Sequence, residues 1–126
     1  MSYEEKALAL RAQGCNCCQT VLGSCCEKLG LPAETAYRLG AFFNGGMRRG
    51  EVCGAVSAAV MALGLRYGDE NNRQCEKSRE FIDAFQEAYG ALRCYDLIGE
   101  DGSGKKTVCP GLILFCVKYL EKEFSE

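Results

Sequence analysis

Ten cysteines and no histidine stand out among the 126 residues of this chain. Without histidine there is no Cys–His nucleophilic pair, no histidine-ligated haem, no Rieske centre and no zinc site of paired cysteines and histidines. Thiolate is the form of cysteine that binds soft metals and attacks disulfides. We therefore expect any metal to be held mainly by sulfur, and any covalent redox chemistry to be thiol chemistry.

Two cysteines fall where helices are expected to begin and where basic residues precede them. Cys53 lies in the first turn of a predicted helix, shortly after two arginines. Cys109 follows two lysines closely and directly precedes Pro110, which predicts the start of the last helix. The positive end of a helix and nearby cations both favour thiolate over thiol. We expect both side chains to be stabilised as thiolates.

Two more cysteines share these features more weakly. Cys17 follows a predicted helix break at Gly14, and Cys94 follows Arg93.

The spacing from Cys15 to Cys18 is C-x-x-C, which in thioredoxin-like proteins follows a β-strand. No strand is predicted here, so these two thiols can equally contribute to a metal site.

The remaining cysteines are expected to have no chemical role. Cys25, Cys26 and Cys116 lie among apolar residues with helical spacing, where a free cysteine packs as a small hydrophobic side chain. Cys75 lies in a polar, charged stretch and is interpreted as an incidental surface thiol.

The elements that must position these thiols are predicted to be helices. Ser2 and Glu5 have capping-box spacing at the start of the first helix, and a second helical run ends at Gly30. A third helix begins with Pro32 in its first turn. Its predicted buried positions are Ala36, Leu39, Gly40 and Phe43.

The second half of the chain continues this pattern. Adjacent glycines predict a turn at 44–46, and residues 51–67 form an apolar helix rich in small side chains. A polar turn is predicted at 68–72, a loop at 99–106, and a last helix from about Pro110. The helix between them has a possible break at Gly90, and its predicted apolar side is Phe81, Phe85, Ala88 and Leu92.

No segment alternates polar and apolar residues with a period of two, so we expect an all-α fold. The helices predict a compact bundle of about five helices in a single domain, residues 1–126. The formal net charge of −2 argues against a nucleic-acid-binding protein, and no apolar run is long enough for an integral membrane protein. The first residues lack the pattern of an export signal, so we expect a cytoplasmic protein.

A glycine-rich stretch at 99–106 nearly matches a phosphate-binding loop. Lys106 occupies the position that the motif gives to serine or threonine, and no strand is predicted before it. We interpret this stretch as a flexible basic loop rather than a nucleotide site.

Several segments together resemble a known family. The motif CGAVSA, which begins at Cys53, is similar to the CGAxxG motif of the C_GCAxxG_C_C family of proteins described as redox-active. The segment NCCQTV from Asn16 resembles that family's N-C-x-Q-x-V segment. FNGGM from Phe43 and GLRYG from Gly64 resemble the approach to the central motif and its exit. Ala58 departs from the family pattern, which has its second glycine there.

Four cysteines recur in that family, and motif by motif they fall on Cys17, Cys53, Cys94 and Cys109. The resemblance implies a small redox protein, and a related domain occurs in a cytochrome that also carries an iron–sulfur centre. We expect these four thiolates to bind a two-iron or four-iron iron–sulfur cluster for one-electron transfer. Cys15 or Cys18 could exchange as a further ligand.

Three alternatives stay open at this point. The same thiols could act in a thiol–disulfide oxidoreductase or redox sensor without metal, with Cys53 as the attacking thiol. They could form a non-redox metal site for zinc or Cu(I), although the paired C-x-x-C knuckles typical of zinc are absent. In a protein-interaction module they would merely pack. An electron-transfer or thiol partner protein is expected but not identified, and a homodimer is compatible with a small bundle.

Overall fold

The computed structural model describes residues 1–69 and 76–125 and confirms the all-α fold. Within those residues there is no strand, and the only ladder-type pairing is an isolated antiparallel bridge between Val52 and Arg93. The elements in chain order are α1 (Tyr3–Ala12), α2 (Cys17–Cys25), α3 (Ala33–Gly40), the turn η1 (Gly46–Gly50), α4 (Gly54–Tyr67), α5 (Glu76–Tyr89), α6 (Cys94–Ile98) and α7 (Lys105–Phe124).

The first two helices begin with reciprocal capping boxes. The Ser2 hydroxyl accepts a hydrogen bond from the Glu5 amide at 3.1 Å, and the Glu5 carboxylate accepts one from the Ser2 amide at 2.9 Å. Asn16 and Gln19 repeat this exchange at the start of α2, with distances of 2.8 and 3.0 Å. Gly14 has a φ of +94° between the two helices, so the predicted break is confirmed.

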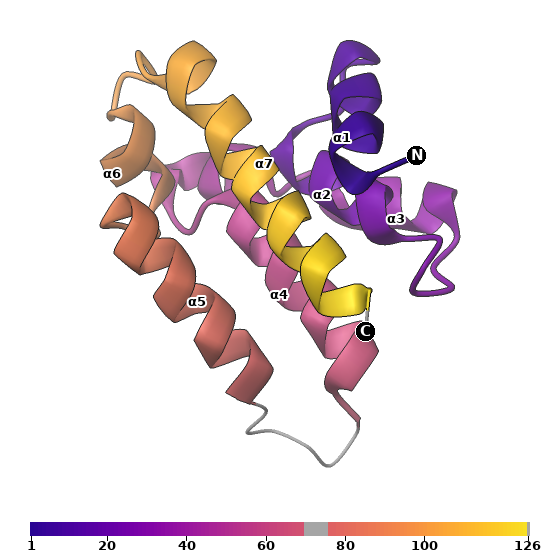
Figure 1. Ribbon diagram of the computed structural model, residues 1–126. Helices are drawn as coiled ribbons and strands as arrows, with labels where there is room; N and C mark the ends of the chain where they lie inside the picture. The colour runs from indigo at the N-terminus through magenta and orange to yellow at the C-terminus, as the bar shows by residue number, and fades with distance from the viewer. Residues whose placement is uncertain (70–75, 126) are drawn as a thin grey trace.

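The bundle is organised around α2, α4 and α7. In Figure 1, α7 runs along α4, with α5 on one side and α1 and α2 on the other. Helix α2 contacts α1, α3, α4 and α7. Ala55, Ala58, Ala59 and Ala62 of α4 are all fully buried, so their small side chains allow these helices to approach closely, as predicted.

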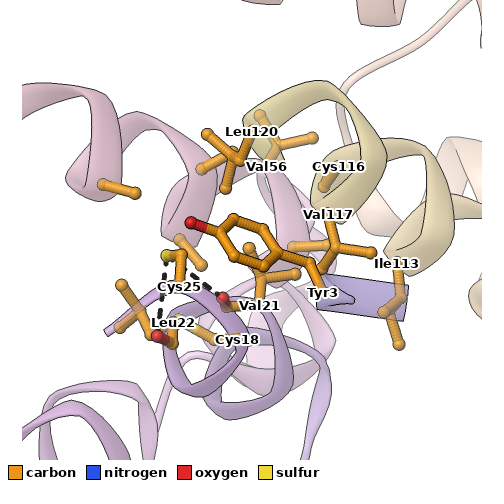
Figure 2. Close-up of a cluster of buried hydrophobic side chains, with 14 of the residues drawn as sticks. Tyr3, Cys18, Val21, Leu22, Cys25, Val56, Ile113, Cys116, Val117 and Leu120 are labelled. Carbon is orange, nitrogen blue, oxygen red and sulfur yellow. Dashed lines mark hydrogen bonds between the residues drawn. The ribbon is translucent and has the colours of Figure 1, made fainter. Parts of the chain in front are cut away.

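The core lies where α1, α2, α4 and α7 meet. The ring of Tyr3 lies among aliphatic and sulfur-containing side chains from three other helices (Figure 2). The Cys25 thiol donates to the carbonyl oxygens of Val21 and Leu22, at 3.4 and 3.6 Å. Cys25 and Cys116 have no exposed surface and Cys26 is also buried, which confirms that these three cysteines pack in the core.

Aromatic side chains join α5 to α7. Phe81 and Phe85 are fully buried and pack edge-on against Tyr119 and Phe115, at centroid distances of 5.1 and 5.6 Å. Of the other two predicted positions, Ala88 is exposed, so the prediction is wrong there. Leu92 is partly buried against the core but lies beyond the end of α5, because the chain breaks at Gly90, with a positive φ, as predicted.

Two other local predictions are wrong. Of the buried positions predicted for the third helix, Ala36 and Gly40 are buried, but Leu39 is 51% exposed. Phe43 packs against the core from beyond α3, because that helix ends at Gly40 after only two turns. The last helix begins at Lys105 rather than at Pro110, so Pro110 lies inside it. This is tolerated because Lys106, whose carbonyl loses its helical donor, is exposed and can be hydrated.

Some predictions fall outside the described part of the chain. Cys75 and most of the turn predicted at 68–72 are among them. Within the described ranges, no helix has both the length and the hydropathy needed to cross a membrane.

Candidate functional site

One cavity of about 520 Å³ lies at the end of the bundle where α6 and η1 meet the starts of α2, α4 and α7. All four cysteines singled out from the sequence line it. Cys17 is the first residue of α2, Cys53 precedes the first residue of α4, Cys94 is the first residue of α6, and Cys109 lies in the second turn of α7. The fold thus brings together four thiols that are separated by up to 92 residues in sequence (109 − 17).

A two-stranded bridge fixes the positions of Cys53 and Cys94 relative to each other. The Cys53 amide donates to the Leu92 carbonyl at 2.8 Å, and the Cys94 amide donates to the Glu51 carbonyl at 2.6 Å. An ion pair at 3.3 Å between Arg93 and Glu51 spans the same bridge. This pairing fixes the separation of two cysteines that begin different helices.

Gly54 brings Cys17 against the start of α4. A Cβ atom at position 54 would lie 2.6 Å from the Cys17 sulfur and 2.7 Å from the Phe43 carbonyl oxygen, both too close for any side chain. The glycine after Cys53 therefore makes room for the Cys17 sulfur. This gives a physical reason for a Cys-Gly pair at this point of the chain.

The thiols influence one another electrostatically. Burial raises the pKa of Cys53 to about 11, and the neighbouring Cys17 and Cys109 add to this, although hydrogen bonds from the Val56 and Ala55 backbone oppose it. Burial also raises the pKa values of Cys94 and Cys109, and Cys17 contributes to both rises. Cys17 therefore interacts with each of the other three thiols.

The prediction that Cys53 and Cys109 are stabilised as thiolates is wrong for the free thiols. Cys109 is not at a helix N-terminus, because α7 begins four residues earlier, at Lys105. Cys53 does precede the first turn of α4, but burial outweighs the backbone amides there. Lys105 does lower the pKa of Cys109, as does Arg11, so the expected cationic effect is present but smaller than the desolvation.

Three cations line the cavity with the thiols: Arg11, Arg48 and Lys105. None of the described lining residues is Asp or Glu. Arg48 and the preceding Met47 are the only non-glycine residues of the described ranges with positive φ, at 61° and 59°. The left-handed backbone conformation costs free energy for residues other than glycine. Such strain is common at functional sites.

Glycines hold this strained turn in place. A Cβ at Gly46 would overlap the Glu51 backbone, and one at Gly50 would overlap the Tyr95 ring. The predicted turn at 44–46 is confirmed, with positive φ at both of its glycines.

Arg93, the cation next to Cys94, differs from the three cations that line the cavity. It pairs with Glu51 and Asp96 and does not line the cavity.

The two cysteines of the C-x-x-C spacing are separated by the fold. Cys15 is half-buried and lines the cavity, whereas Cys18 is fully buried in the core. Burial raises the pKa of Cys18 to about 12. The sequence did not distinguish these two residues, because the burial of Cys18 depends on the helices packed over α2.

The distances between the thiols limit which metal centres they can bind in this conformation. Among residues 1–69 and 76–125, no three Cys, Asp or Glu side chains are placed to hold one metal ion together. Around a single tetrahedral ion the four sulfurs would lie within roughly 4 Å of one another. The thiols are arranged around a cavity rather than around a point.

Comparisons with known proteins bear on this arrangement. Neither the search of curated proteins nor the search of solved structures found a significant match. A family model described as "Putative redox-active protein (C_GCAxxG_C_C)" matches residues 15–123, a span that includes all five cysteines of the cavity. The match covers most of the chain, so this protein belongs to the C_GCAxxG_C_C family that the model describes.

Proposed function

We propose that this protein is an electron carrier whose cavity holds an iron–sulfur cluster through Cys17, Cys53, Cys94 and Cys109. The observation that carries the proposal is the convergence of these four thiols, from four separate elements, on one cavity of about 520 Å³. The match to a redox-active family supports the same class of function.

The donor set fits a cluster better than a single ion. All four donors are sulfur, the ligand that iron–sulfur clusters take from proteins. In a four-iron cluster each iron takes its own cysteine, so the four sulfurs lie farther apart than around one zinc ion. An arrangement of thiols around a cavity, with no three placed for one ion among the described residues, favours the larger group over zinc or Cu(I).

When bound, the cluster would supply one-electron chemistry. The chain's own residues would fix the positions of the ligands, favour their thiolate forms and shield the centre from water. The bridge between Cys53 and Cys94 fixes two ligands, and Gly54 admits the sulfur of a third. Arg11 and Lys105 favour the thiolate forms of nearby cysteines. Leu112 and Ile113, both buried, shield one wall of the cavity from water.

The test is to purify the protein anaerobically, reconstitute it with iron and sulfide, and measure both elements together with the visible spectrum. We expect stoichiometric iron and sulfide, with absorbance that dithionite bleaches. Replacing Cys17, Cys53, Cys94 or Cys109 singly by serine should greatly reduce the iron content, whereas Cys26→Ser should leave it unchanged.

A colourless protein that also fails reconstitution would refute the cluster. The same thiols would then be candidates for disulfide exchange, the alternative that the sequence leaves open.

A further inference from the structure

Cys15 is a fifth thiol of the cavity with no role in the proposed ligand set. Its backbone is anchored on both sides, because its amide donates to the Leu10 carbonyl at 3.1 Å and its carbonyl accepts from the Arg11 guanidinium at 3.0 Å. The next residue, Asn16, is tied to the carbonyls of Gly40 and Ala41. The backbone that carries the half-buried Cys15 side chain is therefore fixed at one position of the cavity wall.

The cations of the cavity have no carboxylate partner among the described residues. Within the described ranges, Arg11, Arg48 and Lys105 form no ion pair, whereas five other basic residues do. Arg48 and Lys105 are exposed, so they lie on the solvent side of the cavity. Three cations beside thiols, without a lining carboxylate, make a site that attracts anions.

We propose that this cavity selects anionic disulfides and that Cys15 is the thiol that exchanges with them. The inference rests on the proposed function in one respect, since four occupied cysteines would leave Cys15 as the free thiol of the cavity.

The exchange is a single displacement. Cys15 loses its proton to water, and its sulfur bonds to one sulfur of the disulfide. The sulfur–sulfur bond of the disulfide breaks, and its other half leaves as a thiolate with the bonding electron pair. Cys15 is thereby oxidised to a mixed disulfide, and half of the substrate is reduced to a thiolate. The cations hold the carboxylates of the incoming molecule and do not take part in bond changes.

The experiment compares two disulfide probes on the reduced, metal-free protein by stopped-flow absorbance. Dithiobis-nitrobenzoate carries two carboxylates, and dithiodipyridine is neutral. We expect a fast phase with the anionic probe that Cys15→Ser and Cys15→Ala both remove and Cys26→Ser retains. Circular dichroism checks that each variant is folded, and fragment masses locate the first labelled thiol.

The chain offers a matched control for the cations. R48Q/K105Q removes two charges that line the cavity, and R49Q/K106Q removes two neighbouring charges that do not. We expect the first pair of substitutions to slow the anionic probe about tenfold more than it slows the neutral probe, because both probes react with thiolate but only the anionic one is attracted by the cations. The second pair should change neither rate.

A fast phase that survives in both Cys15 variants would overturn the proposal, and so would equal slowing by the two double substitutions. Because these measurements use metal-free protein, their outcome does not depend on whether the protein binds iron. In the iron-loaded protein, one cavity thiol should still react with the anionic probe. Loss of that reactivity together with the metal-free result intact would place Cys15 among the cluster ligands and overturn its role as the free thiol.

Discussion

Cysteines occupy two regions of this bundle, and the regions differ in what surrounds the sulfur. In the core, Cys25 and Cys116 are enclosed by apolar side chains, and the Cys25 thiol bonds to backbone carbonyls of its own helix (Figure 2). At the cavity, the thiols of Cys17, Cys53 and Cys109 lie near one another and near cations, beside an open volume.

The difference shows that residue type alone does not assign a role to a cysteine. The pKa of Cys116 is raised well above its ordinary value, with burial as the largest cause, smaller contributions from Cys53 and Cys17, and no opposing cation. The pKa of Cys109 is also raised, but Arg11 and Lys105 oppose the rise. A thiol with cations beside it can lose its proton to a metal or a substrate, and a thiol among aliphatic side chains fills space.

The largest expected effect comes from closing the cavity wall. Gly54→Ala places a methyl group against the Cys17 sulfur and the Phe43 carbonyl, so one of them must move. We expect a loss of about 1–3 kcal/mol in the free energy of unfolding and a large loss of iron binding. Urea unfolding and iron analysis of the reconstituted protein measure the two effects.

Gly64 provides the matched control on the same helix. A Cβ there meets nothing within 4 Å, so Gly64→Ala should stabilise α4 by about 0.5–1 kcal/mol and leave iron binding intact. Equal behaviour of the two alanine variants would show that position 54 has no special role in admitting Cys17.

Alkaline pH should destabilise the protein through its core thiols. The folded-state pKa of Cys25 is raised from 9.0 to about 12, so in this range the unfolded chain loses its proton more readily than the native protein. The stabilisation is fully present below about pH 9 and is lost as the pH rises toward the folded value. We expect the free energy of unfolding, measured under reducing conditions, to fall from about pH 9 upward.

Cys25→Ala separates this effect from that of other groups. It should flatten part of the alkaline slope, because the thiol that titrates only after unfolding is gone. An unchanged slope in this variant would assign the pH dependence to other residues, such as Tyr3, whose pKa is also raised to about 12.

The smallest effect is expected from truncating a core cysteine. Cys116→Ala removes one buried heavy atom and leaves the cavity lining unchanged, so we expect a loss of about 0.5–1.5 kcal/mol. Iron content and thiol exchange should match the unsubstituted protein. A variant that loses iron would place Cys116 in the functional region and remove the distinction between the two regions.

Several features of the fold could be predicted from residues that lie close together in the sequence. The capping boxes at Ser2 and Asn16 and the glycine turn before α4 depend on residues close together in the chain, so their spacing predicts them. The all-α fold follows from helical spacing throughout. The four family cysteines could be named from short motifs, although nothing local shows that they meet.

Tertiary structure decided which thiols meet and how acidic they are. The bridge that fixes Cys53 relative to Cys94 pairs residues about forty positions apart, and no local pattern encodes it. Burial by distant helices separates Cys15 from Cys18 and reverses the expected pKa shift at Cys53. Helix ends and charge patterns act over a few residues, whereas desolvation depends on every element packed around a group. For that reason the thiols could be identified from the sequence, whereas their burial and neighbouring charges depend on the packed structure.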